Sequence, residues 1–291
     1  MKFIIKKQIL LPKRKTGSHK GNNGLVLAVG GSEDYTGAIA LAGLAALRNG
    51  CDLVKIIAPE RVAWAINSYS PDLITKKIKG QNFKVSDFKI LQKEMQKYDV
   101  LLIGNGLGLK NETKKFCKKT IKSLKKFKVI DADAIKSISM DDCENSILTP
   151  HSKELEYFLV NSKIGKKIIE GINNEKNVEI KSKKIKAVAK KFLEKNNVIL
   201  LKGKIDCIIS KNKIYYVKGG NAGMTKGGTG DVLAGLCAGF LAQSEDLEQS
   251  ALNASYFNKL IGDILLKKKK GFTYLASDMV EEIRRIRLLV L

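Results

Sequence analysis

Hydrophobic positions along the chain follow two alternating periods. Short runs of β-branched and aliphatic residues, typical of buried strands, occur at residues 25–29, 53–58, 100–103, 129–132, 146–148 and 198–201. Apolar residues with helical spacing occur at residues 37–49, 86–96, 112–125, 153–159 and 180–194. This alternation is typical of a largely parallel sheet covered by helices on both faces, so we predict a three-layer α/β fold.

The pattern changes after residue 202. Strand-like runs at residues 207–210 and 214–217 are joined by Lys211, Asn212 and Lys213, which predicts a hairpin and therefore antiparallel strands. Three further helices are predicted at residues 231–242, 247–266 and 276–286. No linker rich in proline or serine occurs, and we expect a single domain over residues 1–291. Residues 161–177 are polar, rich in lysine and poorly periodic, so we interpret them as a surface insertion without a site.

The composition is that of a globular protein. Of the 291 residues, 44% are hydrophobic, which is enough for a folded core. No apolar run is long enough to cross a bilayer and no signal-peptide pattern is present, so we expect a cytoplasmic protein without membrane contact. The five cysteines are scattered and odd in number, which favours reduced thiols over disulfides or a metal site.

The net charge of +24 invites a nucleic-acid-binding interpretation. The type of basic residue argues against it, because only six of the 53 are arginine and aromatic residues are not interleaved with the lysines. Proteins that stack on bases or recognise base edges use such side chains. We therefore interpret the lysines as a solvated surface and expect no specific nucleic-acid partner.

The strongest chemical signal is the segment GGNAGMTKGGTGD at residues 219–231, which leads directly into an apolar helix. A glycine-rich turn at a helix start leaves backbone N–H groups unpaired, and the helix dipole adds partial positive charge there. Glycine also lets the backbone approach a phosphate closely. The loop matches neither the Walker A motif nor the dinucleotide fingerprint, but it predicts an anion hole formed by Gly228, Thr229 and Gly230.

Asp231 ends this loop and has two interpretations. It can cap the helix, as carboxylates of the first turn often do. It can instead accept a proton from a group that attacks a bound phosphate, because a carboxylate beside an anion hole is otherwise electrostatically unfavourable. We favour the second interpretation and predict that Asp231 is a catalytic base.

The sequence GGTGD at residues 227–231 resembles the anion-hole and catalytic-base motif of the ribokinase-like superfamily. Other segments narrow the resemblance to the ADP/ATP-dependent NAD(P)H-hydrate dehydratases. They are KGNNG at residues 20–24, GGS at 30–32, YTGA at 35–38, AALRNG at 45–50, IGNGLG at 103–108, IDADA at 130–134, LTPH at 148–151 followed by Glu154, and LKG at 201–203. The segments occur in the order of the family and cover about residues 17–286.

The resemblance implies a ribokinase-like fold and repair of hydrated NADH and NADPH. In the reaction it implies, the terminal phosphoryl group of ADP or ATP passes to the C6 hydroxyl of the S-epimer of the hydrate, and loss of phosphate restores NADH or NADPH. It further implies Mg²⁺ as a cofactor and a homo-oligomer, such as a tetramer. Because no epimerase domain is expected in residues 1–291, a separate NAD(P)H-hydrate epimerase would be the functional partner.

The resemblance also assigns residues to roles. Asp231 removes the proton of the reacting hydroxyl. The hydrate is contacted by Ala38, Gly106, His151 and Asp231, and the nucleotide by Lys202, Gly203, Lys204, Ile205, Asp206 and Gly230. No residue is assigned as a metal ligand. Asp131 and Asp133 follow a predicted strand at a spacing that directs both carboxylates to one face, where they would support either Mg²⁺ or the neighbouring loop.

Alternatives remain at this stage. The glycines can form simple turns, Ala38 can pack in its helix, and His151 and Lys202 can be ordinary polar side chains. The chain also departs from the family at Asn105, where proline is usual, and at Asp206 and Lys226. The nearest alternative function is a ribokinase-like kinase of a vitamin precursor such as hydroxyethylthiazole. A nucleotide-binding regulator without catalysis is the alternative outside enzymes, and the intact Asp231 argues against it.

Overall fold

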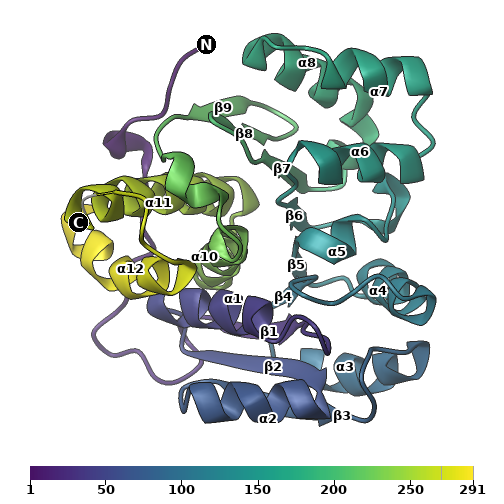
Figure 1. Ribbon diagram of the computed structural model, residues 1–291, viewed down its shortest axis with the longest axis vertical. Coiled ribbons are helices and arrows are strands. Elements are labelled where there is room, and N and C mark those ends of the chain that lie inside the picture. Colours follow the sequence, from purple (N-terminus) through teal and green to yellow (C-terminus); the bar gives the residue numbers. More distant parts are fainter. Residues whose placement is uncertain (270, 291) are drawn as a thin grey trace.

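The computed structural model describes residues 1–269 and 271–290, and in them a nine-stranded sheet forms the middle layer (Figure 1). The strand order is β3-β2-β1-β4-β5-β6-β7-β8-β9. Strands β1 to β7 are parallel, and β8 is antiparallel to both β7 and β9. The strands are β1 (Leu25–Val29), β2 (Leu53–Pro59), β3 (Ile74–Ile78), β4 (Val100–Ile103), β5 (Phe127–Ile130), β6 (Ser146–Leu148), β7 (Asn197–Leu201), β8 (Asp206–Ile209) and β9 (Ile214–Val217).

Helices cover both faces of the sheet, which confirms the predicted three-layer α/β fold (Figure 1). One face carries α1 (Gly37–Arg48), α2 (Glu60–Tyr69), α10 (Thr229–Ser244), α11 (Leu247–Lys268) and α12 (Ala276–Val290). The other carries α3 (Phe88–Met95), α4 (Asn111–Ser123), α5 (Ala132–Ile135), α6 (Ser152–Asn161), α7 (Lys166–Asn173), α8 (Val178–Val188) and α9 (Lys190–Glu194). Short 3₁₀ turns lie at η1 (Lys6–Gln8), η2 (Val85–Asp87), η3 (Met140–Asp142) and η4 (Ala222–Thr225).

Strands β1 and β4 are continuous apolar runs because both of their faces are buried. In β1, Val26 and Ala28 belong to the core on the side of α10, whereas Leu27 and Val29 belong to the core on the opposite side. Successive side chains of a strand point to opposite faces, so β1 contributes to both cores. Among the described residues, no helix is long and apolar enough to span a membrane.

The strand order reverses at β1, and we call the junction of the loops after β1 and β4 the crevice. After β1 the chain adds β2 and β3 on one side, and then crosses β1 to add β4 and the strands that follow on the other side. The loops after β1 and β4 therefore diverge at the carboxyl ends of these strands, where open α/β sheets bind ligands. The two loops are joined by a hydrogen bond of 2.9 Å from the Gly31 N–H to the Asn105 carbonyl.

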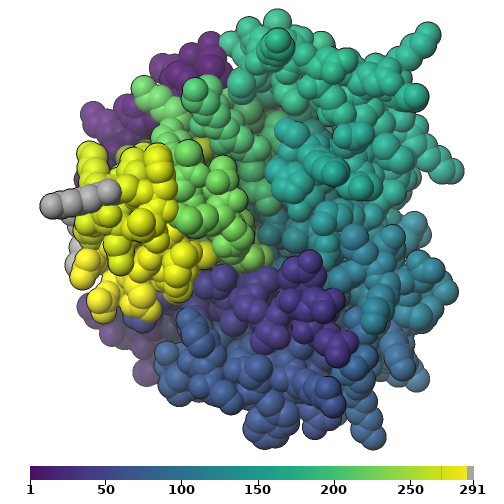
Figure 2. All heavy atoms as spheres, in the orientation of Figure 1, coloured from purple at the N-terminus to yellow at the C-terminus, as the bar shows by residue number. Residues whose placement is uncertain are grey.

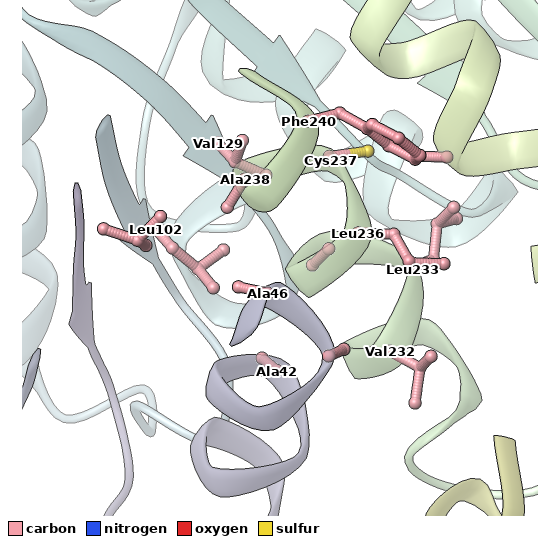
Figure 3. Packing of buried hydrophobic residues seen from close by; sticks show 14 of the residues in the cluster. Ala42, Ala46, Leu102, Val129, Val232, Leu233, Leu236, Cys237, Ala238 and Phe240 are labelled. Carbon is pink, nitrogen blue, oxygen red and sulfur yellow. The ribbon is translucent and has the colours of Figure 1, made fainter. Parts of the chain in front are cut away.

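Helix α10 lies in direct backbone contact with α1. A β-carbon added at Gly235 would lie 2.1 Å from the carbonyl oxygen of Ala42, and one added at Gly239 would lie 2.9 Å from that of Ala46. Figure 3 shows Ala42 and Ala46 of α1 facing α10 across this contact. Glycine is required at Gly235, because any side chain there would force the two helices apart.

Three details differ from the sequence-based expectations. The fifth strand is Phe127–Ile130, so residues 131 and 132 lie beyond it, and Asp131 precedes α5. Residues 161–177, interpreted from the sequence as a poorly periodic surface insertion, contain α7, whose Ile169 and Ile172 are buried. Helix α2 and strand β3 were not predicted. Strand β3 lacks a clear apolar pattern because it carries two lysines and is an edge strand with exposed positions.

Replacing Gly235 with alanine is expected to lower the free energy of unfolding by about 3 kcal/mol or more, because the new methyl group overlaps the backbone of α1. Gly171→Ala is the matched control: it also lies in a helix, and a β-carbon there meets no atom within 4 Å. This control should change stability by less than about 1 kcal/mol, in the stabilising direction. Urea denaturation of both variants measures the difference, and equal stabilities would contradict the proposed contact.

Candidate active site

A cavity of about 810 Å³ opens at the carboxyl ends of β5, β6 and β7. The first turn of α10, the loop after β9 and one side of α11 complete its walls, and the surface is hollowed there between the green and teal segments (Figure 2). A cavity of this size accommodates a ligand as large as a nucleotide. Of the residues predicted from the sequence, those that line it are His151, Lys202, Gly203, Lys204, Asp206, Gly228, Thr229, Gly230 and Asp231.

The start of α10 forms one wall of the cavity. Gly228 precedes the helix with φ +92°, and a β-carbon there would lie 2.7 Å from the Ala276 side chain. The hydroxyl of Thr229 donates to the carbonyl of Met224 at 2.7 Å, which fixes the loop before the helix. Because the first N–H groups of a helix have no acceptor within it, Gly230 and its neighbours present an electropositive backbone to the cavity.

A lysine lies beside this helix start. A β-carbon added at Gly230 would lie 3.5 Å from Nζ of Lys202. Lys202 Nζ contacts Asp131 at 3.0 Å and Glu154 at 3.5 Å. Burial acts to lower the pKa of Lys202, but the two carboxylates outweigh it and hold this pKa above its usual value. Lys202 is therefore a cation at neutral pH, next to the predicted anion hole.

Asp131 is held by three donors. Its side chain is only 2% exposed, and its Oδ1 accepts from the Thr149 hydroxyl at 2.6 Å and from Lys202. Its Oδ2 accepts from Nδ2 of Asn105 at 2.9 Å. Both oxygens of Asp131 are thus occupied by protein donors.

Asp231 lies in the first turn of α10, with its carboxylate directed toward the same cluster. Its Oδ1 accepts from Nδ2 of Asn105 at 2.7 Å. Burial, together with the nearby charge of Asp131, raises the pKa of Asp231 to about 7, although the hydrogen bond from Asn105 and the charge of Lys202 oppose the rise. A carboxyl group with this pKa can exchange a proton at neutral pH, as a general base must.

His151 caps the first turn of α6. Its Nδ1 accepts from the backbone N–H groups of Lys153 and Glu154, both at 3.2 Å, so a neutral imidazole carries its proton on Nε2. Burial lowers the pKa of His151, and the charge of Glu154 opposes this change only in part. The ring is 51% exposed and lines the cavity as a neutral donor.

The turn between β7 and β8 is tied to α11 by a buried ion pair. Asp206 accepts from the Gly203 N–H at 2.9 Å and from the Ser255 hydroxyl at 2.8 Å, and it lies 3.2 Å from Nζ of Lys259. Burial raises the pKa of Asp206, and the charge of Lys259 opposes it. Through these contacts, the Asp206 carboxylate stabilises the turn.

Ile205, also predicted to contact the nucleotide, is absent from the cavity walls and packs against the core on the opposite face of the sheet from α10.

Ala38 and Gly106 lie together at the crevice between β1 and β4, outside the walls of the cavity. Gly106 has φ +65°, and a β-carbon there would lie 3.2 Å from that of Ala38. The preceding residue, Asn105, contacts Asp231. The predicted residues thus form two groups, the cavity and this crevice, with Asp231 next to both.

The two aspartates after β5 have different partners. Oδ2 of Asp133 accepts from the Gly108 N–H and its Oδ1 accepts from Lys136 Nζ, both at 2.9 Å. Asp133 therefore supports the loop after β4, whereas Asp131 belongs to the Asn105 and Lys202 cluster. The expected shared strand face is not formed, because β5 ends at Ile130. No group of three or more His, Cys, Asp or Glu residues within the described ranges is arranged to hold a metal ion.

Two residues have contacts that the sequence did not reveal. Asn105 donates to both Asp131 and Asp231. The sequence feature that could have indicated this role is a polar side chain among glycines at the end of a buried strand. Lys226 donates to the carbonyls of Phe272 and Tyr274 and lies over the Tyr274 ring, 5.0 Å from its centre. Its ammonium group fastens the glycine-rich loop to the segment before α12.

Comparisons with known proteins identify the family of the chain. The family model described as NAD(P)H-hydrate dehydratase matches residues 26–285. The bifunctional NAD(P)H-hydrate repair enzyme Nnr of Methanocaldococcus jannaschii is 39% identical over 279 residues, which are 95% of this chain and 50% of that protein. The chain thus spans about half the length of this and similar bifunctional relatives.

Two further proteins match over nearly their whole length. The ADP-dependent (S)-NAD(P)H-hydrate dehydratase of Nitrosopumilus maritimus is 34% identical, over 97% of this chain and 94% of that protein. The crystal structure of the ADP/ATP-dependent NAD(P)H-hydrate dehydratase of Bacillus subtilis, obtained with ATP and Mg²⁺, has a TM-score of 0.77 and 25% identity. The match covers 99% of this chain and 98% of the Bacillus subtilis protein. The resemblance stated from the sequence is confirmed, and the chain belongs to the NAD(P)H-hydrate dehydratase family.

Proposed function

We propose that the protein uses ADP or ATP to dehydrate the S-epimer of NADH and NADPH hydrate, a lyase reaction that restores NADH and NADPH. The observation that carries this proposal is Asp231, a carboxyl group with a pKa of about 7 beside the electropositive start of α10 and Lys202. Transfer of a phosphoryl group to a hydroxyl needs both a base and an anion site. The family of the chain and its similarity to the ADP-dependent (S)-NAD(P)H-hydrate dehydratase of Nitrosopumilus maritimus support the choice of substrate.

In the proposed reaction, the cavity holds the nucleotide. The backbone of Gly228, Thr229 and Gly230 would line the site of its terminal phosphates, where Lys202 would add positive charge. Lys202, Gly203, Lys204 and Asp206 line the side formed by the β7–β8 turn. Because Asp206 is already hydrogen-bonded, the nucleotide contacts we propose there come from the backbone.

The hydrate would extend from the crevice, where it would contact Ala38 and Gly106, to the wall of the cavity that carries the neutral His151. Asp231 lies between the two ligands and accepts the proton of the C6 hydroxyl while the hydroxyl oxygen bonds to the terminal phosphorus of the nucleotide. Breakage of the bond between C6 and oxygen then releases phosphate, and loss of a proton from the adjacent carbon restores the double bond.

Mg²⁺ would supply positive charge to the phosphates. The carboxylates of Asp131 and Asp133 are occupied by protein donors, so they do not form a dedicated metal cage. The residues fit a cation that binds mainly through the nucleotide phosphates and water, as Mg²⁺ often does. The single domain, the separate epimerase, the homo-oligomer and the cytoplasmic location stay predictions.

A kinase of a small alcohol uses the same base and anion hole but stops at the phosphorylated product. The match of 39% to a hydrate repair enzyme and the dehydratase family model favour the dehydratase. The two functions are distinguished by whether phosphate is released or retained on the product.

Asp231→Asn is expected to lower kcat by about 10³-fold or more, because the amide cannot accept the proton. The measurement is the increase in absorbance of the reduced nicotinamide after NADH hydrate, Mg²⁺ and ADP or ATP are added. The variant should fold at least as stably as the wild type, since it removes a partly buried charge, and a thermal melt checks this. Full activity in the folded variant would exclude Asp231 as the base, and an inactive wild type with both nucleotides would exclude the dehydratase.

The pH dependence of kcat/KM should show an acid limb with an apparent pKa of about 7. Asp231 is active only when ionised, so activity falls as pH drops through this pKa and reaches a plateau above it. Initial rates over a pH series at low hydrate concentration and saturating nucleotide measure it. An acid limb near pH 4, the ordinary range of a carboxyl group, would contradict the perturbed pKa.

A further inference from the structure

The side chain of Asn105 lies buried between two carboxylates. It is fully buried, and its Nδ2 lies 2.7 Å from Oδ1 of Asp231 and 2.9 Å from Oδ2 of Asp131. A primary amide has two N–H groups, so each carboxylate receives one. The amide thus occupies both of its donors in joining the C-terminal end of β5 to the first turn of α10.

The orientation of this amide is determined by charge. Rotation by half a turn would place Oδ1 of Asn105 against the oxygens of Asp131 and Asp231, which are acceptors when ionised. In the observed orientation Oδ1 is buried and has no hydrogen-bond partner among the described residues. An unpaired buried acceptor is unfavourable, so the two contacts made by Nδ2 outweigh this cost.

The position of Asn105 is fixed by its backbone as well. Its carbonyl accepts from the Gly31 N–H at 2.9 Å, which ties it to the loop after β1. A β-carbon at the following residue, Gly106, would lie 2.7 Å from the Tyr35 carbonyl. The side chain therefore extends from a closely packed loop, and its Nδ2 has little freedom to leave the carboxylates.

We propose that Asn105 is a positioning residue, which holds the carboxylate of Asp231 in one orientation and favours its ionised form. This proposal rests on the proposed function, in which Asp231 is the base. The charged groups that face Asp231 are Asp131 after β5, Glu154 in α6 and Lys202 after β7. The two acids oppose its ionisation and Lys202 favours it, so loss of the Asn105 donor would shift the balance toward the protonated, inactive form.

Two variants test the proposal. Asn105→Leu keeps a similar volume without a donor, and Asn105→Ala is the smaller alternative if leucine does not fold. Thr149→Val is the matched control, because it removes a buried hydrogen bond to Asp131 but leaves both contacts of Asn105. Thermal melts establish that the variants compared are folded.

The first readout is the pKa of Asp231, measured by NMR titration of the ¹³C-labelled aspartate carboxyl groups in the ligand-free enzyme. The Asp231 signal is assigned by its loss in Asp231→Asn. We expect the Asn105 variants to raise this pKa by about 1, because a hydrogen bond to the ionised form is lost. Thr149→Val should change it by less than half as much.

The second readout is the pH profile of hydrate conversion. The Asn105 variants should lower kcat by about 10- to 100-fold with little change in KM, and the acid limb of kcat/KM should rise with the measured pKa. An unchanged pKa of Asp231 in a folded Asn105 variant would overturn the proposal, as would equal effects of Thr149→Val. The NMR titration needs no substrate, so an inactive wild type would reject the proposed function without obscuring the effect of Asn105 on Asp231.

Discussion

The contact between the backbones of α1 and α10 determines where the chemistry of this protein can take place. Since Gly235 and Gly239 have no side chains, α10 lies directly on α1 and above β4 and β5. Its first turn then begins at the carboxyl ends of those strands, where Asn105 and Asp131 emerge. The proposed anion hole and the proposed base are consecutive residues, 228–231, at the start of one helix, so a single packing contact positions both.

The site balances opposite electrostatic requirements. The start of α10 and Lys202 attract a phosphate, whereas Asp131, Glu154 and Asp231 place carboxylates within the same cluster. Donors from the protein hold Asp131, and Lys202 remains a cation because two acids surround it. Burial and the charge of Asp131 raise the pKa of Asp231, so Asp231 is the carboxyl group of this cluster best suited to accept a proton near neutral pH.

Local patterns in the sequence were sufficient for the layers, most of the elements and the glycine-rich loop, because periodicity and turn chemistry depend on neighbouring residues. They could not show contacts between distant residues. The Asp206 carboxylate is occupied by Ser255 and Lys259, about fifty positions away, and Lys226 is held by Phe272 and Tyr274. Asn105 meets Asp231 only because α10 folds back over β4, and α7 was missed since its buried Ile169 and Ile172 lie in a lysine-rich segment.

In the proposed reaction, the hydroxyl oxygen of the hydrate leaves as part of phosphate. The most direct measurement uses NADH hydrate labelled with ¹⁸O in the C6 hydroxyl and follows the label by mass spectrometry while ADP or ATP is consumed. We expect the released inorganic phosphate to carry the label, in an amount equal to the NADH formed. Label recovered in water, with unlabelled phosphate or intact nucleotide, would contradict phosphoryl transfer to the substrate.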